Sequence, residues 1–270
     1  PGTLNGFRRP LSEVQIIRSR RAKKGGIGNN IETFDAEKKV WTIKVGDSAI
    51  SWAKAIGKLV AGKFPAEKLV LDFSEIRPAG TRLKGYGWIS SGDEQIAKAF
   101  SSIAEIMSNR ADQLLTRMDI LDIVNWLGTI LSSRRSAEIA LFEYGQLEWE
   151  DFATAKKEWW LRDNAHRQQS NNSLLFYTKP TKEEISKVFD LVTESGGSEP
   201  GMINAKEAER RAPWFKGCNP CVEILLGNKS FCNLTEVNVQ AFKGDKVGLE
   251  RALCLSARMN YRQTMVDLRD

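Results

Sequence analysis

The sequence lacks any long run of apolar residues. No stretch approaches the roughly 20 apolar residues that a membrane-spanning helix needs. The first residues also lack the apolar core of a secretory signal peptide. Apolar residues are 41% of the 270 and charged residues 27%, so the chain can bury a core and stay dissolved. We therefore expect a cytoplasmic protein that binds no membrane.

Nucleic-acid-binding modules are missing as well. The sequence contains no zinc finger, no RNP-type aromatic pair and no helix-turn-helix pattern. The glycine-rich stretch 24–30 lacks the spacing of a P-loop and predicts a tight turn. Positive charge is concentrated between Arg8 and Lys24, a segment with seven basic residues and one acidic residue. The rest of the chain is near neutral. We interpret residues 1–24 as a basic extended arm, either solvated or set against an acidic surface, with phosphate binding as the alternative. Polynucleotide binding is not expected.

Cysteine is absent from the first 217 residues. Because structural disulfides are rare in reducing compartments, the late clustering of cysteines indicates redox chemistry or metal binding. A structural zinc site is an alternative, although the spacing fits no common zinc module. Four inert core cysteines are another alternative, but Asn, Pro and Glu beside one of them fit it poorly. The four cysteines are Cys218, Cys221, Cys232 and Cys254.

Strand and helix patterns alternate along the chain. This order favours an α/β fold with parallel strands, whose functional residues gather in loops at the carboxyl ends of the strands. The predicted strands are 39–45, 69–73, 136–142, 173–177, 202–204, 222–226 and 233–239. The predicted helices are 49–61, 93–109, 119–131, 149–160, 182–195 and 246–259.

The residues around Cys221 suit radical chemistry on a diol. A thiol S–H can yield a radical, the carboxylate of Glu223 can take a proton from a hydroxyl, and the amide of Asn219 can hold a diol in place. A further thiol such as Cys232 can supply reducing equivalents by closing to a disulfide.

These motifs resemble those of a known enzyme family. Asn219-Pro220-Cys221-Val222-Glu223-Ile224, with the later Cys232-Asn233-Leu234, resembles the active-site stretch of ribonucleotide reductase large subunits. The 11-residue step from Cys221 to Cys232 is similar to that of the adenosylcobalamin-dependent (class II) ribonucleoside-triphosphate reductases. The resemblance covers about residues 24 to 265. Its other segments, in the family's order, are 68–80, 90–92, 122–128, 134–138, 170–173 and 199–204.

The resemblance implies a fold and a set of roles. Residues 25–270 would be part of a ten-stranded α/β barrel, with the radical cysteine on a central finger loop. Cys221 would carry the thiyl radical that takes the 3′ hydrogen, Glu223 would be the base on the 3′ hydroxyl, and Asn219 would hold the ribose hydroxyls. Cys232 would be one of the two thiols that reduce the 2′ carbon. Substrate binding is expected at Asn172, Ser173 and Pro220, and effector binding at the loop of Ser132, Ser133, Arg134, Arg135 and Ser136.

The same resemblance implies a cofactor and partners. We expect adenosylcobalamin, a ribonucleotide substrate, a deoxyribonucleotide effector and a thioredoxin-like reductant, with no metal at the site. Residues 1–24 hold no cysteine to pair with Cys232, and the family's C-terminal half has no counterpart here. A second reductase polypeptide is therefore expected to complete the barrel. The loop at 132–136 is shorter than is usual in the family, and the long insertion of the monomeric triphosphate reductases is missing after Asn30.

Two alternatives stay open. The chain could be a catalytically inactive nucleotide-binding or regulatory paralogue, although such a copy has no physical need to keep all four reactive residues. Cys218 could be a tolerated small side chain, or a substitute reductant that pairs with Cys232 or Cys221.

Overall fold

A computed structural model describes residues 4–19, 28–83, 89–130, 138–159, 161, 163–230 and 232–265. The chain divides into two compact units, residues 1–207 and residues 208–270. Parallel strands and helices alternate through the first unit, which confirms the predicted α/β class. Among the described helices, none is long and apolar enough to cross a membrane.

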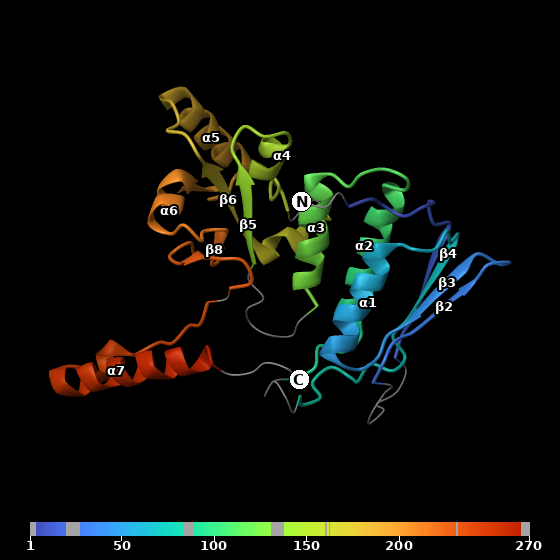
Figure 1. The fold of residues 1–270 in the computed structure, drawn as a ribbon, viewed down its shortest axis with the longest axis horizontal. Coiled ribbons are helices and arrows are strands. Elements are labelled where there is room, and N and C mark those ends of the chain that lie inside the picture. The colour runs from blue at the N-terminus through green and yellow to red at the C-terminus, as the bar shows by residue number, and fades with distance from the viewer. Residues whose placement is uncertain are drawn as a thin grey trace. The chain divides into compact units, whose positions relative to one another are not determined.

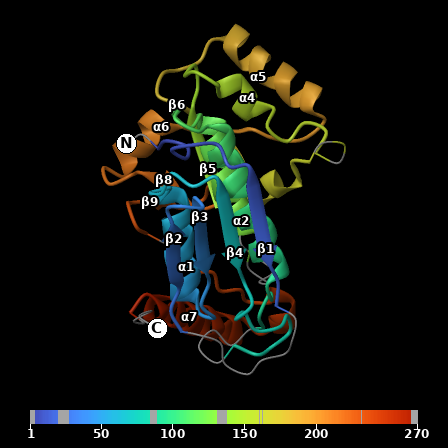
Figure 2. The ribbon, with the colours of Figure 1, turned by 90° about the vertical axis from the view of Figure 1, so that its right-hand side faces the viewer.

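The first unit begins with a four-stranded sheet. Its order is β1-β4-β3-β2, and Figure 2 shows the four strands side by side. β1, β4 and β3 run parallel, and β2 pairs antiparallel with β3 through a hairpin. At this hairpin the Asp35 carboxylate accepts the backbone N–H groups of Glu37 and Lys38. The strands are β1 (Glu13–Ile17), β2 (Ile31–Asp35), β3 (Val40–Lys44) and β4 (Lys68–Asp72).

Helices α1 (Ala49–Ala61) and α2 (Glu94–Asn109) cover one face of this sheet (Figure 1). The Ser48 hydroxyl caps α1 by accepting the N–H of Ser51, and Gly62 ends the helix in the left-handed conformation. Apolar side chains from the sheet and both helices meet in a fully buried core, which supplies most of the unit's hydrophobic stabilisation. The largest of them are Trp41, Ile43, Leu59, Leu69, Leu71, Phe73, Ile96, Phe100, Ile103 and Met107.

A second sheet in the same unit has three parallel strands in the order β5-β6-β7. Phe152, Leu174, Phe176 and Val188 form the centre of its core. Its strands are β5 (Glu138–Glu143), β6 (Ser170–Phe176) and β7 (Gly201–Asn204). Its helices are α3 (Arg117–Gly128), α4 (Trp149–Ala153), the 3-10 helix η1 (Ala165–Gln169) and α5 (Lys182–Ser195).

Helix α3 packs in both cores of the first unit. Ile123 and Trp126 belong to the core of the four-stranded sheet, whereas Met118 and Leu121 pack in the core of the three-stranded sheet. Thr116 and Asp119 form a reciprocal capping box at its start. α3 therefore ties the two sheets of this unit together.

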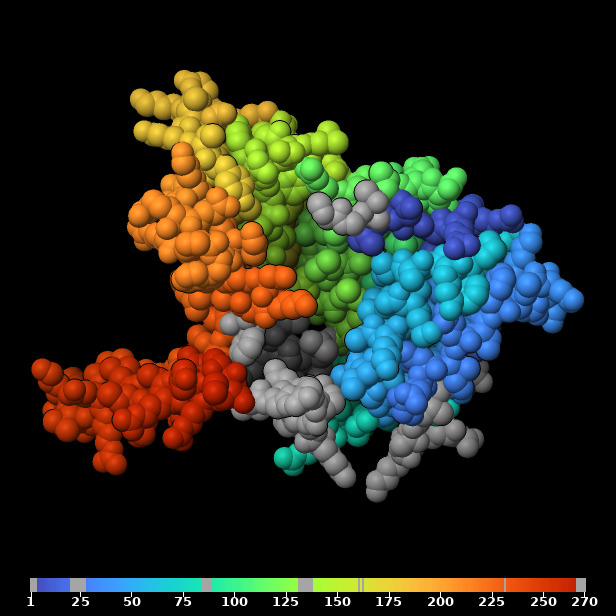
Figure 3. All heavy atoms as spheres, in the orientation of Figure 1, coloured from blue at the N-terminus to red at the C-terminus, as the bar shows by residue number. Residues whose placement is uncertain are grey.

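The second unit is small and contains few regular elements. Its short hairpin pairs β8 (Gly217–Cys218) antiparallel with β9 (Leu225–Leu226). A 3-10 helix η2 (Val239–Phe242) precedes the long helix α7 (Lys246–Gln263). α7 contains no buried residue, and its side chains stand out along the helix in Figure 3 (red). Helix α6 (Ala205–Arg211) spans the boundary between the units.

Three segments differ from the sequence-based expectation. Glu13–Ile17, within the expected basic arm, form strand β1 against β4. The helix expected over 149–160 ends at Ala153. The carbonyl of Ala155 accepts hydrogen bonds from Arg167 and Asn164 side chains instead of a helical N–H. The strand expected over 222–226 is reduced to β9, because Val222 has a φ of 70°.

No strand forms over the expected range 233–239 either. Residues 233–238 have no regular structure, and residues 239–242 form η2. The side-chain amides of Asn233 and Asn260 instead donate to each other's backbone carbonyl, at 3.3 and 3.4 Å. This segment is thus tied to α7 rather than to a sheet.

Candidate active site

Three of the four candidate catalytic residues, Asn219, Cys221 and Glu223, lie on the loop between β8 and β9. The backbone N–H of Val222 donates to the carbonyl of Asn219 at 2.9 Å, which closes a four-residue turn. Pro220 takes the second position of this turn, where its fixed φ is favourable, and Cys221 takes the third. The turn places the Cys221 thiol on an exposed site at the end of the hairpin.

Asn219 stabilises this loop through hydrogen bonds to Ile224. Its side-chain Oδ1 accepts the backbone N–H of Ile224 at 3.0 Å, and its own N–H donates to the Ile224 carbonyl at 3.3 Å. The residue is buried, with 4% of its surface exposed. Because Oδ1 is occupied by the backbone, the Nδ2 group is the part of the amide that remains to bind a ligand.

Glu223 is exposed on the same loop, next to the turn. Burial raises the pKa of the Cys218 thiol, and the negative charge of Glu223 raises it further. A raised pKa keeps sulfur in the protonated form, which is a poor nucleophile and a poor metal ligand. Cys218 is thus a buried thiol of lowered reactivity, which favours the interpretation as a tolerated small side chain over a substitute reductant.

Cys232 lies beyond β9 in the second unit and is half-buried. Its thiol contacts the carbonyl of Asn233 at 3.8 Å. Cys254 is exposed on α7, inside a regular helix as the sequence predicted. Among the described residues, which include all four cysteines, no three Cys, His, Asp or Glu side chains gather in a way that could hold a metal ion. The described part of the chain therefore offers no ligand set for the zinc alternative.

The two expected substrate-binding residues on β6 point to opposite faces of the sheet, since successive side chains alternate along a strand. Asn172 shares the helix-covered face with Leu174 and Phe176, accepts a hydrogen bond from the Ser170 hydroxyl at 2.7 Å, and lines a cavity of about 200 Å³. Ser173 faces the other way. A substrate on one face of the sheet can therefore meet only one of them.

Ser173 also fits tightly against the neighbouring strand. It pairs with Gly201 of β7, and a Cβ on Gly201 would lie 2.6 Å from the Ser173 hydroxyl oxygen. Only glycine at position 201 lets this hydroxyl approach so closely.

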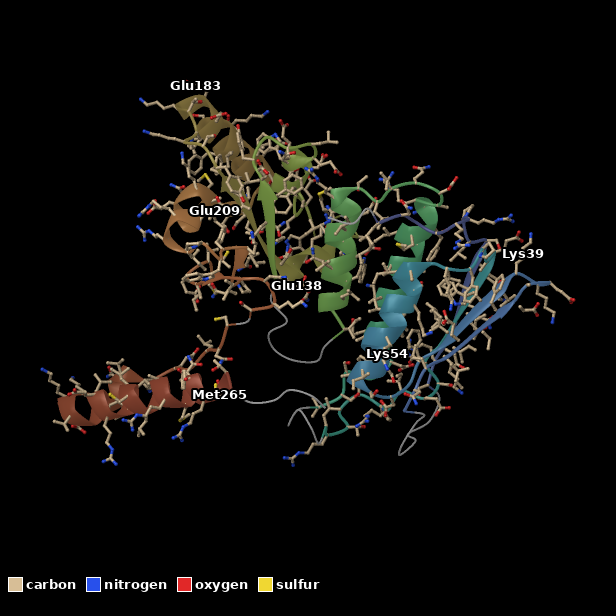
Figure 4. All side chains as sticks on the ribbon, viewed as in Figure 1. Lys39, Lys54, Glu138, Glu183, Glu209 and Met265 are labelled. Carbon is tan, nitrogen blue, oxygen red and sulfur yellow. The ribbon has the colours of Figure 1, made fainter. Side chains whose placement is uncertain are left out.

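The expected effector loop, Ser132 to Ser136, lies outside the described residues. Glu138, at the start of β5, follows it and lies beside the end of α3 (Figure 4). Its carboxylate occupies the space that a Cβ on Gly128 would need, at 2.6 Å. Burial raises the pKa of Glu138 to about 7, and its Oε2 atom is buried with no hydrogen-bond partner among the described residues.

One polar cluster was not predicted from the sequence. Asp122 on α3 accepts hydrogen bonds from the His166 ring and from the Arg167 guanidinium, both on η1. The fact that His166 is the only histidine of the chain was a signal that the sequence offered. No periodic pattern, however, connects positions so far apart in the chain.

No protein-family model matches the chain. A curated relative, the adenosylcobalamin-dependent ribonucleoside-triphosphate reductase of Lactobacillus gasseri, is 34% identical in an alignment of 244 positions that covers 82% of this chain and 31% of that protein. The enzyme of the same name from Lactobacillus helveticus is 30% identical in an alignment of 278 positions that covers 88% of this chain and 36% of that protein. The chain thus spans about one third of the length of these relatives.

A solved structure is also similar. It is a crystal structure of a B12-dependent (class II) ribonucleotide reductase, with a TM-score of 0.70 and 26% identity over 97% of this chain and 38% of that one. Sequence and structure thus agree with the resemblance that the motifs indicated. The chain is homologous to a segment of the adenosylcobalamin-dependent (class II) ribonucleotide reductases.

Proposed function

We propose that this chain is the radical-bearing part of a ribonucleotide reductase that converts ribonucleotides to deoxyribonucleotides in the cytoplasm. The observation that carries the proposal is the β8–β9 loop, where an exposed thiol, an exposed carboxylate and a buried amide lie within five residues. These are the three groups that hydrogen abstraction from a diol needs. A catalytically inactive paralogue is the weaker alternative, because nothing in such a protein would require all three.

Each residue has a defined step in the proposed reaction. The Cys221 thiyl radical takes the hydrogen atom from the 3′ carbon, and Glu223 takes the proton of the 3′ hydroxyl. Asn219 holds the ribose hydroxyls through Nδ2, and Pro220 shapes the turn beneath the substrate. Cys232 and a second thiol supply two protons and two electrons: one proton leaves with the 2′ hydroxyl as water, the other hydrogen goes to the 2′ carbon, and the two sulfurs close to a disulfide. Cys221 then returns the hydrogen to the 3′ carbon.

Two further sites belong to the first unit. We assign Ser173 to substrate binding and Asn172 to the helix-covered face, because successive side chains of β6 point to opposite faces of the sheet. The loop of Ser132 to Ser136 binds the deoxyribonucleotide effector in this proposal, as the resemblance implies.

Adenosylcobalamin supplies the radical when it is bound. The exposed position of Cys221 fits this role, because a radical source outside the hairpin can reach the sulfur. Two cavities lined by described residues of the first unit hold about 200 and 330 Å³, and neither is large enough to enclose a corrin ring. The cofactor would be held jointly with the remaining part of the barrel.

The remaining part of the ten-stranded barrel would come from the rest of the reductase, of which this chain would be a fragment or subunit, with Cys221 on the central finger loop. That part would carry the second reducing thiol, and a thioredoxin-like protein would reduce the disulfide again. The unpaired edges of the described sheets suit such an addition. β1 and β2 form the edges of the four-stranded sheet, and β5 and β7 those of the three-stranded sheet.

The reaction itself is the test. The full chain is combined with a polypeptide that supplies the rest of the reductase barrel, with adenosylcobalamin, a dithiol reductant and ribonucleoside di- or triphosphates. Deoxyribonucleotide is then measured by chromatography. We expect product only when the chain is present. Nucleotide binding without any product in the complete mixture would instead support the inactive paralogue.

A further inference from the structure

The cavity beside Asn172 is lined by polar groups that the proposed reaction does not use. It holds about 200 Å³ and lies on the helix-covered face of the three-stranded sheet, within the first unit. Asn172 itself is 3% exposed, so its amide is shielded from bulk solvent and lines the cavity. Residues 196–198, which follow α5, line the cavity too and are exposed, so a ligand can enter beside them.

A chain of contacts fixes the direction of the Asn172 amide. The Ser170 hydroxyl donates to Oδ1 of Asn172 at 2.7 Å, and the Ser170 carbonyl accepts from the Lys156 ammonium group. The same ammonium group pairs with Oε2 of Glu199 at 2.6 Å, and both side chains are largely buried. Because Oδ1 of Asn172 is occupied, its Nδ2 group is the end of the amide that is left for a ligand.

Three of these side chains form a row along the cavity, with Lys156 between the other two. Glu199 keeps its second oxygen, Oε1, as an acceptor. Lys156 has three N–H groups and uses two of them in the contacts above, which leaves one donor. Asn172 adds Nδ2 as a further donor. The row therefore presents an acceptor, a donor and a second donor, in this order.

A hydroxyl in the same lining is buried and unpaired. Oγ of Ser195, at the end of α5, has no hydrogen-bond partner among the described residues. Buried polar atoms are almost always hydrogen-bonded in native proteins, so each exception needs an explanation. A ligand in the cavity would supply the missing partner.

We infer that this cavity binds a cytosine-type ring, which carries an amino group, a ring nitrogen and a carbonyl oxygen in a row along one edge. That edge presents a donor and then two acceptors, which is the complement of Glu199, Lys156 and Asn172. Uracil presents an acceptor, a donor and an acceptor along the same edge. Two of its three groups would therefore meet a group of the same kind.

The rest of the lining suits a ligand of this size. The volume lies below the roughly 300 Å³ at which pockets for drug-sized ligands begin, so one ring fits and a whole nucleotide does not. Trp159 lines the cavity and offers an aromatic surface to the ring. The Ser195 hydroxyl accepts the second hydrogen of the amino group. Ser173 points to the opposite face of the sheet, so this site is separate from the proposed substrate site.

Titration of the full chain with the free bases cytosine and uracil, followed by ligand-observed NMR, tests the site. A free base has no ribose and no phosphate, so the proposed active site around Cys221, which holds ribose hydroxyls, has nothing to bind. We expect cytosine to bind and uracil to bind at least about tenfold more weakly, because the two rings differ along the edge that the row contacts.

Three variants locate the binding. Asn172→Asp keeps an acceptor for the Ser170 hydroxyl but loses the Nδ2 donor, so cytosine should bind at least about tenfold more weakly. Ser195→Ala should weaken binding about fivefold, and it serves if Asn172→Asp fails to fold, because its hydroxyl has no partner to lose. Glu194→Gln is the matched control, since it breaks an exposed pair with Lys157 next to the lining and should bind cytosine normally.

Three results would overturn the site. Cytosine could fail to bind the unsubstituted chain, or cytosine and uracil could bind it equally. Cytosine could also bind Asn172→Asp and Ser195→Ala as tightly as the unsubstituted chain, which would place the ligand elsewhere. No reductase activity is measured, so each result bears on this cavity alone and leaves the proposed function unchanged.

Discussion

At the scale of single residues, we propose that Asn219 serves two purposes with the two ends of one amide. Its Oδ1 accepts the Ile224 N–H and stabilises the loop, and in the proposed function its Nδ2 binds the ribose. The two purposes can be separated by substitution, because a carboxylate keeps the acceptor and loses the donor.

Asn219→Asp keeps the acceptor for the Ile224 N–H but places a carboxylate at a buried position, so it should lower the stability of the chain as a whole, whereas Asn219→Ala should weaken the loop by about 1 kcal/mol, the net worth of one hydrogen bond. Exchange of the Ile224 amide reports the loop directly, and reductase activity reports the ribose contact. Both variants should lose activity, but only Asn219→Ala should expose the Ile224 amide. Unchanged protection of this amide in Asn219→Ala would show that Oδ1 does not hold the loop.

The thiols should differ in reactivity according to their surroundings. Cys221 and Cys254 are exposed, whereas Cys218 is buried and its pKa is raised. We expect iodoacetamide at pH 7.5 to label Cys218 at least about tenfold more slowly than Cys221 and Cys254, because the thiolate is the nucleophile. Mass spectrometry of the digested chain measures each site separately. Rapid labelling of Cys218 in the folded chain would favour its alternative role as a substitute reductant.

Glu138 should make stability depend on pH. Its pKa rises from an ordinary 4.5 to about 7 because the carboxyl is partly buried. Between these values the folded chain binds a proton that the unfolded chain releases, so stability falls as pH rises through this window. Glu138→Gln should therefore stabilise the chain by about 1 kcal/mol at pH 8, allowing for solvent screening, and should have little effect at pH 4.5.

Urea unfolding at the two pH values, followed by tryptophan fluorescence, measures the Glu138→Gln effect. Glu143→Gln is the matched control, because Glu143 is exposed at the other end of the same strand. An equal gain from Glu138→Gln at both pH values would contradict the raised pKa.

At the scale of elements, sequence patterns predicted the helices better than the short strands. The helices expected over 49–61 and 182–195 match α1 and α5, which begin directly after the caps Ser48 and Thr181. β1 escaped prediction because its burial comes from pairing with β4, far away in sequence, and not from its own composition. α4 ends early because the side chains of Arg167 and Asn164 donate to the Ala155 carbonyl, which would accept a backbone N–H if the helix continued.

The candidate site shows the same division. The Cys221 loop could be named from its motif, because the chemistry is local in sequence. The different surroundings of Asn172 and Ser173 could not be predicted, because they depend on which face of β6 the helices cover. The Asp122 cluster could not be predicted either, because it depends on a contact between residues 44 positions apart.

The pairing of β6 with β7 should depend on Gly201. A methyl group there would meet the Ser173 hydroxyl at 2.6 Å. Gly201→Ala should therefore destabilise the chain by about 1–3 kcal/mol through overpacking. Ser173→Ala in the same chain should restore a large part of this loss by removing the oxygen. The double-mutant comparison is made by thermal unfolding, and strictly additive effects would show that the two groups do not meet.

At the scale of the whole molecule, the chain combines two units with different duties. The first unit carries the two larger sheets, the Asp122 cluster and the proposed effector and substrate residues. The second carries all four cysteines and has little core of its own. A unit with so little core fits a reactive loop whose active site is completed by the rest of the reductase. This agrees with a chain that spans about one third of the length of its relatives.

The central claim is that Cys221 carries the radical, and replacing this one sulfur tests it most directly. Ribonucleotide reduction is measured in the complete mixture for Cys221→Ala and for Cys254→Ala, which removes an exposed thiol elsewhere in the same unit. We predict that Cys221→Ala abolishes product formation while still binding nucleotide, and that Cys254→Ala keeps the activity of the unsubstituted chain. Deoxyribonucleotide formed by Cys221→Ala at the normal rate would contradict the account.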